Sequence, residues 1–163
     1  MPHHPSPGFT LAELVVVLAI VGLLAALAVP AYRETTMRRQ LRIAAEELRA
    51  DLDRARLLAI TTGEPVHVIA HDGTRSWAGG WSARQRGGIV TSIGHPPLDA
   101  HFRTGRRQPS MIQFKPDGTV IQGHTLTLCA RKQPATAMSI VIALAGRIRT
   151  DASDPADARD CAR

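Results

Sequence analysis

The stretch "GFTLAELVVVLAIVGLLAALAVPAY", from Gly8 to Tyr32, decides the fold. Its apolar run covers the 21 residues from 9 to 29, which is roughly 31 Å of helix at ~1.5 Å per residue and about the thickness of a bilayer's hydrocarbon layer. A secretory signal peptide has a basic start, a shorter apolar run and small residues after that run. Here the leader "MPHHPSPG" lacks Lys and Arg, and its small residue precedes the run. The stretch therefore predicts a membrane-anchoring helix.

Glu13 is the one charged residue inside this apolar run. An unpaired carboxylate that is fully inserted in a bilayer costs roughly 2.5–3.5 kcal/mol, so a cationic partner is expected. Cleavage after Gly8 would supply one, because the new α-amino group on Phe9 would lie one helical turn away. In a packed array of such helices, the carboxylate of one subunit can also meet the amine of its neighbour. We therefore expect Glu13 to act in assembly.

These residues resemble the class III signal of type IV pilins and pseudopilins. The resemblance implies a leader over 1–8, cleavage between Gly8 and Phe9 by a prepilin peptidase, and N-methylation of Phe9. It also implies a transmembrane and assembly helix over 9–30, with Glu13 as the acid of the fifth mature position. The leader departs from the family in carrying histidines where pilins usually carry Lys or Arg.

Residues 31–163 are expected to form one periplasmic globular domain. Between 33 and 62 the apolar residues recur every three or four positions, which predicts an amphipathic helix that ends at Gly63 and Pro65. Strand patterns follow at 66–70, 87–93, 110–115, 119–123, 124–130 and 138–150. Segments 73–88 and 94–109 are interpreted as loops, and 151–163 as a tail that is disordered unless Cys161 is tethered.

The predicted fold class is α+β and pilin-like, with the long N-terminal helix packed on an antiparallel sheet. The spacing of "ARLLAITTGEPVHV", "IQFKPDGTVIQG" and "IVIALAGRIR" resembles the GspH/FimT family of minor pilins. Two cysteines, Cys129 and Cys161, form a disulfide if the domain lies outside the cytoplasm and stay free thiols in a reducing compartment. The N-terminal segment favours the disulfide.

The charge of the chain is basic, with 20 Lys and Arg against 14 Asp and Glu, a net charge of +6 and a pI near 10.6. This favours a polyanionic partner, either nucleic acid or anionic lipid. No catalytic constellation, metal-ligand spacing or phosphate-binding loop is found, so neither enzyme activity nor a cofactor is expected. Trp77 and Trp81 would stack on bases if exposed, but a place in the core of a small β domain is favoured.

The stretch "AGRIRT" is the candidate binding site. On a strand, Arg147 and Arg149 project to one face about 6–7 Å apart, while Ile148 points into the core. Two such guanidiniums can bind neighbouring phosphates, but exposed arginines on an edge strand also discourage aggregation. The residues alone favour neither phosphate binding nor protection against aggregation. The resemblance to the Gly-Arg-x-Arg motif of DNA-binding FimT pilins, placed on Gly146, Arg147 and Arg149, implies DNA binding.

Further basic residues of the loop 94–109 would widen this patch if they lie close to it in the fold. These residues are Arg103, Arg106 and Arg107.

Two functions follow from these patterns. The first is a FimT-like minor pilin, held in the inner membrane before it joins other subunits in an extracellular type IV pilus. It would bind double-stranded DNA without sequence specificity and support DNA uptake in natural transformation. The alternative is an H-type pseudopilin of a type II secretion system, a structural subunit without a DNA role.

Overall fold

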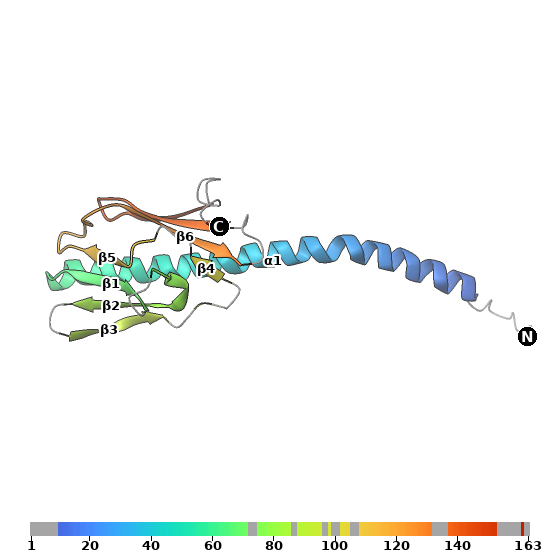
Figure 1. Cartoon of the computed structure of the whole chain (residues 1–163), viewed down its shortest axis with the longest axis horizontal. Coiled ribbons are helices and arrows are strands. Elements are labelled where there is room, and N and C mark those ends of the chain that lie inside the picture. The colour runs from blue at the N-terminus through green and yellow to red at the C-terminus, as the bar shows by residue number, and fades with distance from the viewer. Residues whose placement is uncertain are drawn as a thin grey trace, which may run out of the picture. The chain divides into compact units, whose positions relative to one another are not determined.

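The computed structural model describes residues 10–71, 75–85, 88–95, 98, 102–104, 108–131, 137–152 and 161. The chain divides into two compact units, Met1–Thr36 and Met37–Arg163. A single α-helix begins in the first unit and ends in the second, and the strands follow it (Figure 1). The elements are α1 (Leu11–Thr62), β1 (Val66–Ala70), the 3-10 helix η2 (Trp77–Gly79), β2 (Trp81–Gln85), β3 (Gly88–His95), β4 (Phe102–Thr104), β5 (Met111–Phe114), β6 (His124–Ala130), β7 (Ala137–Ile142) and β8 (Ile148–Ala152).

The part of α1 that belongs to the first unit contains Pro30, and the large apolar side chains described between Leu11 and Leu24 are exposed. Within the residues whose placement is described, no helix has both the length and the apolar character needed to cross a membrane. The membrane-spanning segment expected over 9–30 stays a prediction.

The part of α1 that belongs to the second unit buries one face, as the three-and-four spacing predicted. Gly63 ends the helix in a left-handed conformation with φ of 70°, and its N–H donates to the Ala59 carbonyl at 3.1 Å. Glycine adopts this conformation without steric cost, which is why it so often follows the last helical turn. The buried positions are Leu41, Ala44, Ala45, Leu48, Leu52, Ala55 and Ala59, with Leu58 partly buried beside them.

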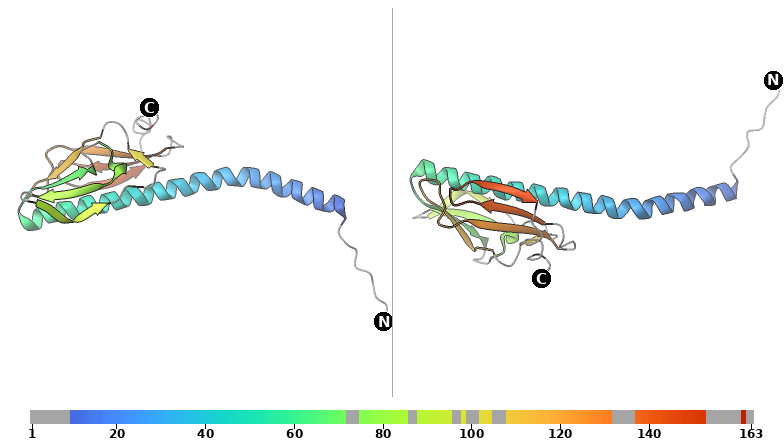
Figure 2. Two further views of the ribbon diagram at one scale, coloured as in Figure 1. Left: turned by 60° about the horizontal axis from the view of Figure 1, so that its bottom comes forward. Right: turned by 90° about the horizontal axis from the view of Figure 1, so that it is seen from above.

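The strands form two four-stranded antiparallel sheets, where the sequence predicted one. Their orders are β3-β2-β1-β5 and β4-β6-β7-β8. Both sheets lie against the second half of α1 (Figures 1 and 2). Alternate residues of the strands join the buried helix face in one hydrophobic core, including Val68, Ile112, Leu128 and Ile140. The expected α+β architecture of helix on antiparallel sheet is thus present in the second unit.

Four of the expected segments differ from the structure. The predicted loop 73–88 contains η2 and β2, and the predicted loop 94–109 contains β4. The expected strand 119–123 makes only a single bridge, between Val120 and Phe114. The expected strand 138–150 is a hairpin of β7 and β8. The sequence pattern missed β2 because glycines flank it. It missed the turn between β7 and β8 because the residues of that turn are apolar.

Both tryptophans lie in the core, as favoured from the sequence. The Trp77 indole N–H donates to the Pro109 carbonyl at 2.8 Å, and that of Trp81 donates to the Asp51 carboxylate at 3.0 Å. Asp51 is only 6% exposed and also accepts a bond from Arg54 at 2.7 Å. The buried carboxylate therefore joins α1 to β2.

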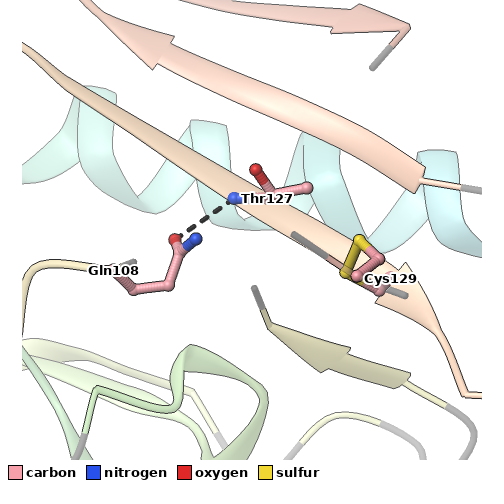
Figure 3. The surroundings of a disulfide bond; sticks show 4 residues. Gln108, Thr127 and Cys129 are labelled. Atoms are coloured by element: carbon pink, nitrogen blue, oxygen red, sulfur yellow. Dashed lines mark hydrogen bonds between the residues drawn. A yellow bond between two sulfur atoms is a disulfide. The ribbon is translucent and has the colours of Figure 1, made fainter. Parts of the chain in front are cut away.

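Cys129 and Cys161 form the predicted disulfide, with their Cα atoms 5.7 Å apart (Figure 3). Both are buried in a small cluster with Ala137, separate from the main core. Close by, the Gln108 side chain accepts the backbone N–H of Thr127 at 3.2 Å. Of the predicted tail, 151–152 belong to β8, while 153–160 and 162–163 lie outside the described residues.

Candidate nucleic-acid interface

The candidate motif lies at the start of β8, in the hairpin that β8 forms with β7. Ile148 pairs with Ile142 and Arg149 with Val141. The turn between the strands is closed by two backbone bonds, from Gly146 N–H to the Ala143 carbonyl and from Ala143 N–H to the Arg147 carbonyl. Arg147 therefore lies where the turn meets the strand, and not within the strand as the sequence suggested.

Gly146 has a structural role in the motif. Its φ is 76°, and a Cβ atom added there would lie 1.9 Å from the Gly118 carbonyl oxygen and 2.7 Å from Arg56 Nε. Arg56 donates from that same Nε to the Gly118 carbonyl at 2.8 Å. The end of α1 and two turns of the chain therefore meet at a point that has no room for a side chain. Gly146 fixes the turn that carries Arg147.

The three residues after Gly146 alternate as predicted between solvent and core. Arg147 and Arg149 are exposed, while Ile148 is 5% exposed and belongs to the main core. Because β8 is the outermost of the described strands of its sheet, one of its backbone edges has no described strand beside it. Two cationic side chains are thus anchored at a sheet edge by the core residue between them.

The two guanidiniums differ in their surroundings. Arg149 Nε lies 2.9 Å from a carboxylate oxygen of Asp151, and both side chains are about half exposed. Arg147 forms no ion pair with another residue of the described part of the chain. Sequence reasoning missed Asp151, although residues two apart on a strand share a face. The pattern Arg-x-Asp was the signal that could have found it.

The rest of this sheet face is uncharged across β6, β7 and β8. Arg149 is level with Val141 and Thr125, and Asp151 is level with Ser139 and Thr127. On the opposite face, the Thr150 hydroxyl donates to Glu46 of α1. The acidic helix residue therefore approaches β8 from the core side, away from the face of Arg149.

The additional arginines of the loop 94–109 are only partly placed. Arg103 lies on β4, where its Cα pairs with that of Cys129. It occupies the other edge strand of the same sheet, with β6 and β7 between it and β8. At about 4.8 Å per strand this separation is roughly 14 Å. Arg106 and Arg107 lie outside the described residues.

The predicted assembly residue Glu13 takes part in a cap at the start of α1. Thr10 N–H donates to the Glu13 carboxylate at 3.3 Å, and Glu13 N–H donates to the Thr10 hydroxyl at 3.2 Å. This reciprocal pair is a capping box, whose signature Thr-x-x-Glu could have been found in the sequence. Gly8 and Phe9, the predicted processing residues, lie outside the described part of the chain.

Comparison with known families agrees with this architecture. The family model described as type II transport protein GspH matches residues 44–146. The chain belongs to the GspH family. A second model, the prokaryotic N-terminal methylation motif, matches residues 5–29 of this GspH-family chain.

Solved structures show that the GspH-family chain has the pilin-like fold predicted from its sequence. It is similar to the type IV minor pilin FimU of Pseudomonas aeruginosa, with a TM-score of 0.61 and 25% identity over 72% of this chain and 92% of that one. It shares its fold with the minor pseudopilin EpsH of the Vibrio cholerae type 2 secretion system, with a TM-score of 0.52 and 16% identity over 69% and 97% of the two chains.

Curated relatives match over shorter stretches. A fimbrial protein of Pseudomonas aeruginosa is 46% identical over 59 residues, which is 36% of this chain and 38% of that protein. The type IV major pilin protein PilE1 of Neisseria gonorrhoeae is 64% identical over 33 residues, 20% of each chain. The chain thus spans well under half the length of these relatives. The combined matches identify a minor-pilin-like protein of the GspH family.

Proposed function

We propose that this GspH-family protein is a FimT-like minor type IV pilin that binds double-stranded DNA without sequence specificity through Arg147 and Arg149, and so supports DNA uptake. The observation that carries the proposal is the pair of exposed arginines on either side of core-anchored Ile148, at the free edge of a sheet. Because the turn before them is fixed at Gly146, both backbone positions are set before any ligand arrives.

Arginine suits this task because its planar guanidinium can donate two hydrogen bonds to one phosphate. Contacts to phosphate position a duplex but do not read its bases, so unrelated sequences bind alike. Two arginines per subunit bind weakly, and several subunits in one filament raise the avidity without new contacts. The described residues of β6 and β7 that are level with Arg149 and Asp151 are uncharged, so they do not repel phosphate.

The N-terminal residues would serve anchoring and assembly. In this proposal a prepilin peptidase removes the leader 1–8, Phe9 becomes N-methylated, and the apolar segment holds the chain in the inner membrane with its globular unit in the periplasm. Glu13 then meets the amine of a neighbouring pilin subunit, and the assembled protein becomes extracellular. Support comes from the match of the N-terminal methylation motif to residues 5–29.

A second candidate is a structural pseudopilin of a type II secretion system. The family model that matches residues 44–146 is described as a type II transport protein, which favours this candidate. Such a subunit would need the core and the assembly helix, but no arginine pair. DNA binding therefore separates the two proposals.

The test is the binding of labelled duplexes of unrelated sequence to the purified full chain in non-ionic detergent, followed by fluorescence anisotropy. The wild type should bind all duplexes alike, with log K falling by ~0.9 for each phosphate neutralised as log salt rises. Arg147→Gln combined with Arg149→Gln should remove most of the binding and flatten the slope by about one to two contacts. The fold should persist, since both side chains are exposed.

The matched control is Arg42→Gln combined with Arg84→Gln, which removes the same charge from exposed positions on α1 and β2. Arg54 and Arg56 are unsuitable controls because they bond to buried Asp51 and to the Gly118 carbonyl. If both double variants weakened DNA binding equally, the loss would result from net charge alone and not from a specific site. A wild-type chain without salt-sensitive binding would leave the secretion pseudopilin as the better proposal.

A further inference from the structure

Arg149 is already paired with an acid in the protein without DNA. Its Nε lies 2.9 Å from Asp151 Oδ2, and the two side chains are 56% and 47% exposed. A phosphate that binds Arg149 must either share the guanidinium with this carboxylate or displace it. The carboxylate also repels the phosphate, since both carry negative charge.

Asp151 is the one acid that the described strands place on this face beside the arginine pair. The residues level with Arg149 and Asp151 on β7 and β6 are Val141, Thr125, Ser139 and Thr127, all uncharged. Glu46 approaches β8 from the other face through Thr150. Among the described residues of these strands, Asp151 is therefore the acid that acts on Arg149 at shortest range.

We infer that Asp151 competes with DNA phosphate for Arg149 and thereby holds the DNA affinity of each subunit low. This inference rests on the proposed function, because it needs Arg149 to contact phosphate. The competitor lies just beyond the motif, two residues after Arg149 on the same strand. A subunit of this kind releases DNA readily, while a filament with several such subunits retains it by avidity.

The geometry is suited to competition rather than to permanent blockage. Exposed ion pairs are weak, because water screens both charges and holding two side chains together costs entropy. A phosphate that accepts two guanidinium bonds can therefore displace Asp151 at modest cost. Removing the carboxylate should tighten DNA binding by about two- to fivefold, the range that exposed pairs span.

The experiment uses the full chain in non-ionic detergent with Asp151→Asn, which keeps the shape of the side chain and removes its charge. We expect the affinity for a short labelled duplex to rise about two- to fivefold, and the salt slope to steepen by up to ~0.9 as Arg149 becomes fully available to phosphate. The matched control is Asp53→Asn. Asp53 is also 47% exposed and also pairs with an arginine, Arg49 at 3.7 Å, but it lies on α1.

A double-mutant cycle then tests whether the effect of Asp151→Asn on DNA affinity depends on Arg149. In an Arg149→Gln background, Asp151→Asn should change the affinity no more than Asp53→Asn does, because the arginine it frees is gone. The inference is overturned if Asp151→Asn and Asp53→Asn act alike in the wild-type background. It is also overturned if Asp151→Asn still strengthens binding fully without Arg149.

Failure of the proposed function has a different signature. In that case neither the wild type nor Asp151→Asn binds DNA in a salt-sensitive manner, or the arginine double variant binds as well as the wild type. Urea unfolding of each variant should match the wild type, because Asp151 and Asp53 are both about half exposed. A gain in affinity at unchanged stability is a result that misfolding does not produce.

Discussion

At the scale of single residues, the motif Gly-Arg-Ile-Arg divides into positions fixed by folding and positions free to bind. Position 146 requires glycine because a backbone carbonyl lies where a side chain would be. Position 148 requires an apolar residue because Ile148 belongs to the core. Arg147 and Arg149 are exposed and have no such constraint. Glycine and isoleucine in such a motif are therefore explained by folding alone, whereas folding does not explain the two arginines.

Gly146→Ala should destabilise the protein strongly. We expect the free energy of unfolding to fall by about 2 kcal/mol or more, since the left-handed conformation alone costs a residue with a Cβ about 1–2 kcal/mol. The added Cβ would also meet the Gly118 carbonyl at 1.9 Å, and backbone atoms cannot rotate away as a side chain can. Urea unfolding of the unit 37–163, which holds the whole core described above, measures the loss.

The matched control is Gly63→Ala, at a φ of 70° with nothing within 4 Å of the added Cβ. It carries the conformational cost without the clash, so the difference between the two variants isolates the contact with Gly118. Equal losses at both positions would contradict the close approach of the two turns.

At the scale of elements, the start of α1 is where the leader would be removed. In the capping box, the Glu13 carboxylate accepts a hydrogen bond from the N–H group of Thr10 at the start of the helix. Cleavage after Gly8 would place a competing amine on Phe9, close to the same carboxylate. We expect the intact mass of protein from native membranes to correspond to a chain that begins at methylated Phe9. Leader retained in assembled filaments would contradict this.

The strand pattern of the sequence predicted some elements and missed others for identifiable reasons. The segment 66–70 matches β1, whose residues alternate between buried and partly buried positions. The segment 124–130 matches β6, although the last five residues of that strand are all buried. The β7–β8 turn was missed because it carries exposed Leu144 where a polar residue is usual. The Arg149–Asp151 pair was missed because the expected strand ended at 150, whereas β8 continues to Ala152.

Contacts between distant parts of the chain were beyond the sequence pattern. Asp51 pairs with Arg54, three residues further along the helix, at 2.7 Å, a contact that local spacing allows. Its burial against the Trp81 indole, 30 residues away, depends on β2. Because β2 was interpreted as loop, neither the strand nor the buried carboxylate could be predicted.

At the scale of the whole molecule, the disulfide ties the C-terminal part of the chain to β6. It joins residues 32 positions apart, and the chain-entropy model assigns about 3–4 kcal/mol of stability to a loop of this size. Urea unfolding of the unit 37–163 with and without reductant should show a loss of this order. Free thiols titrated under denaturing conditions in protein from the periplasm would contradict the pairing in vivo.

The hydrogen bond from Arg56 to the Gly118 carbonyl joins residues that are 62 positions apart in the sequence. It lies against Gly146, in the turn that carries Arg147. Long-range contacts of this kind form late, because the loop between them must be closed first. An unfolded chain carries the same arginines, but it lacks the contact between Gly146 and the Gly118 carbonyl that holds the turn beneath Arg147 against the helix. If the proposed DNA binding depends on this turn, the fraction of molecules that bind a labelled duplex measures the fraction that have folded.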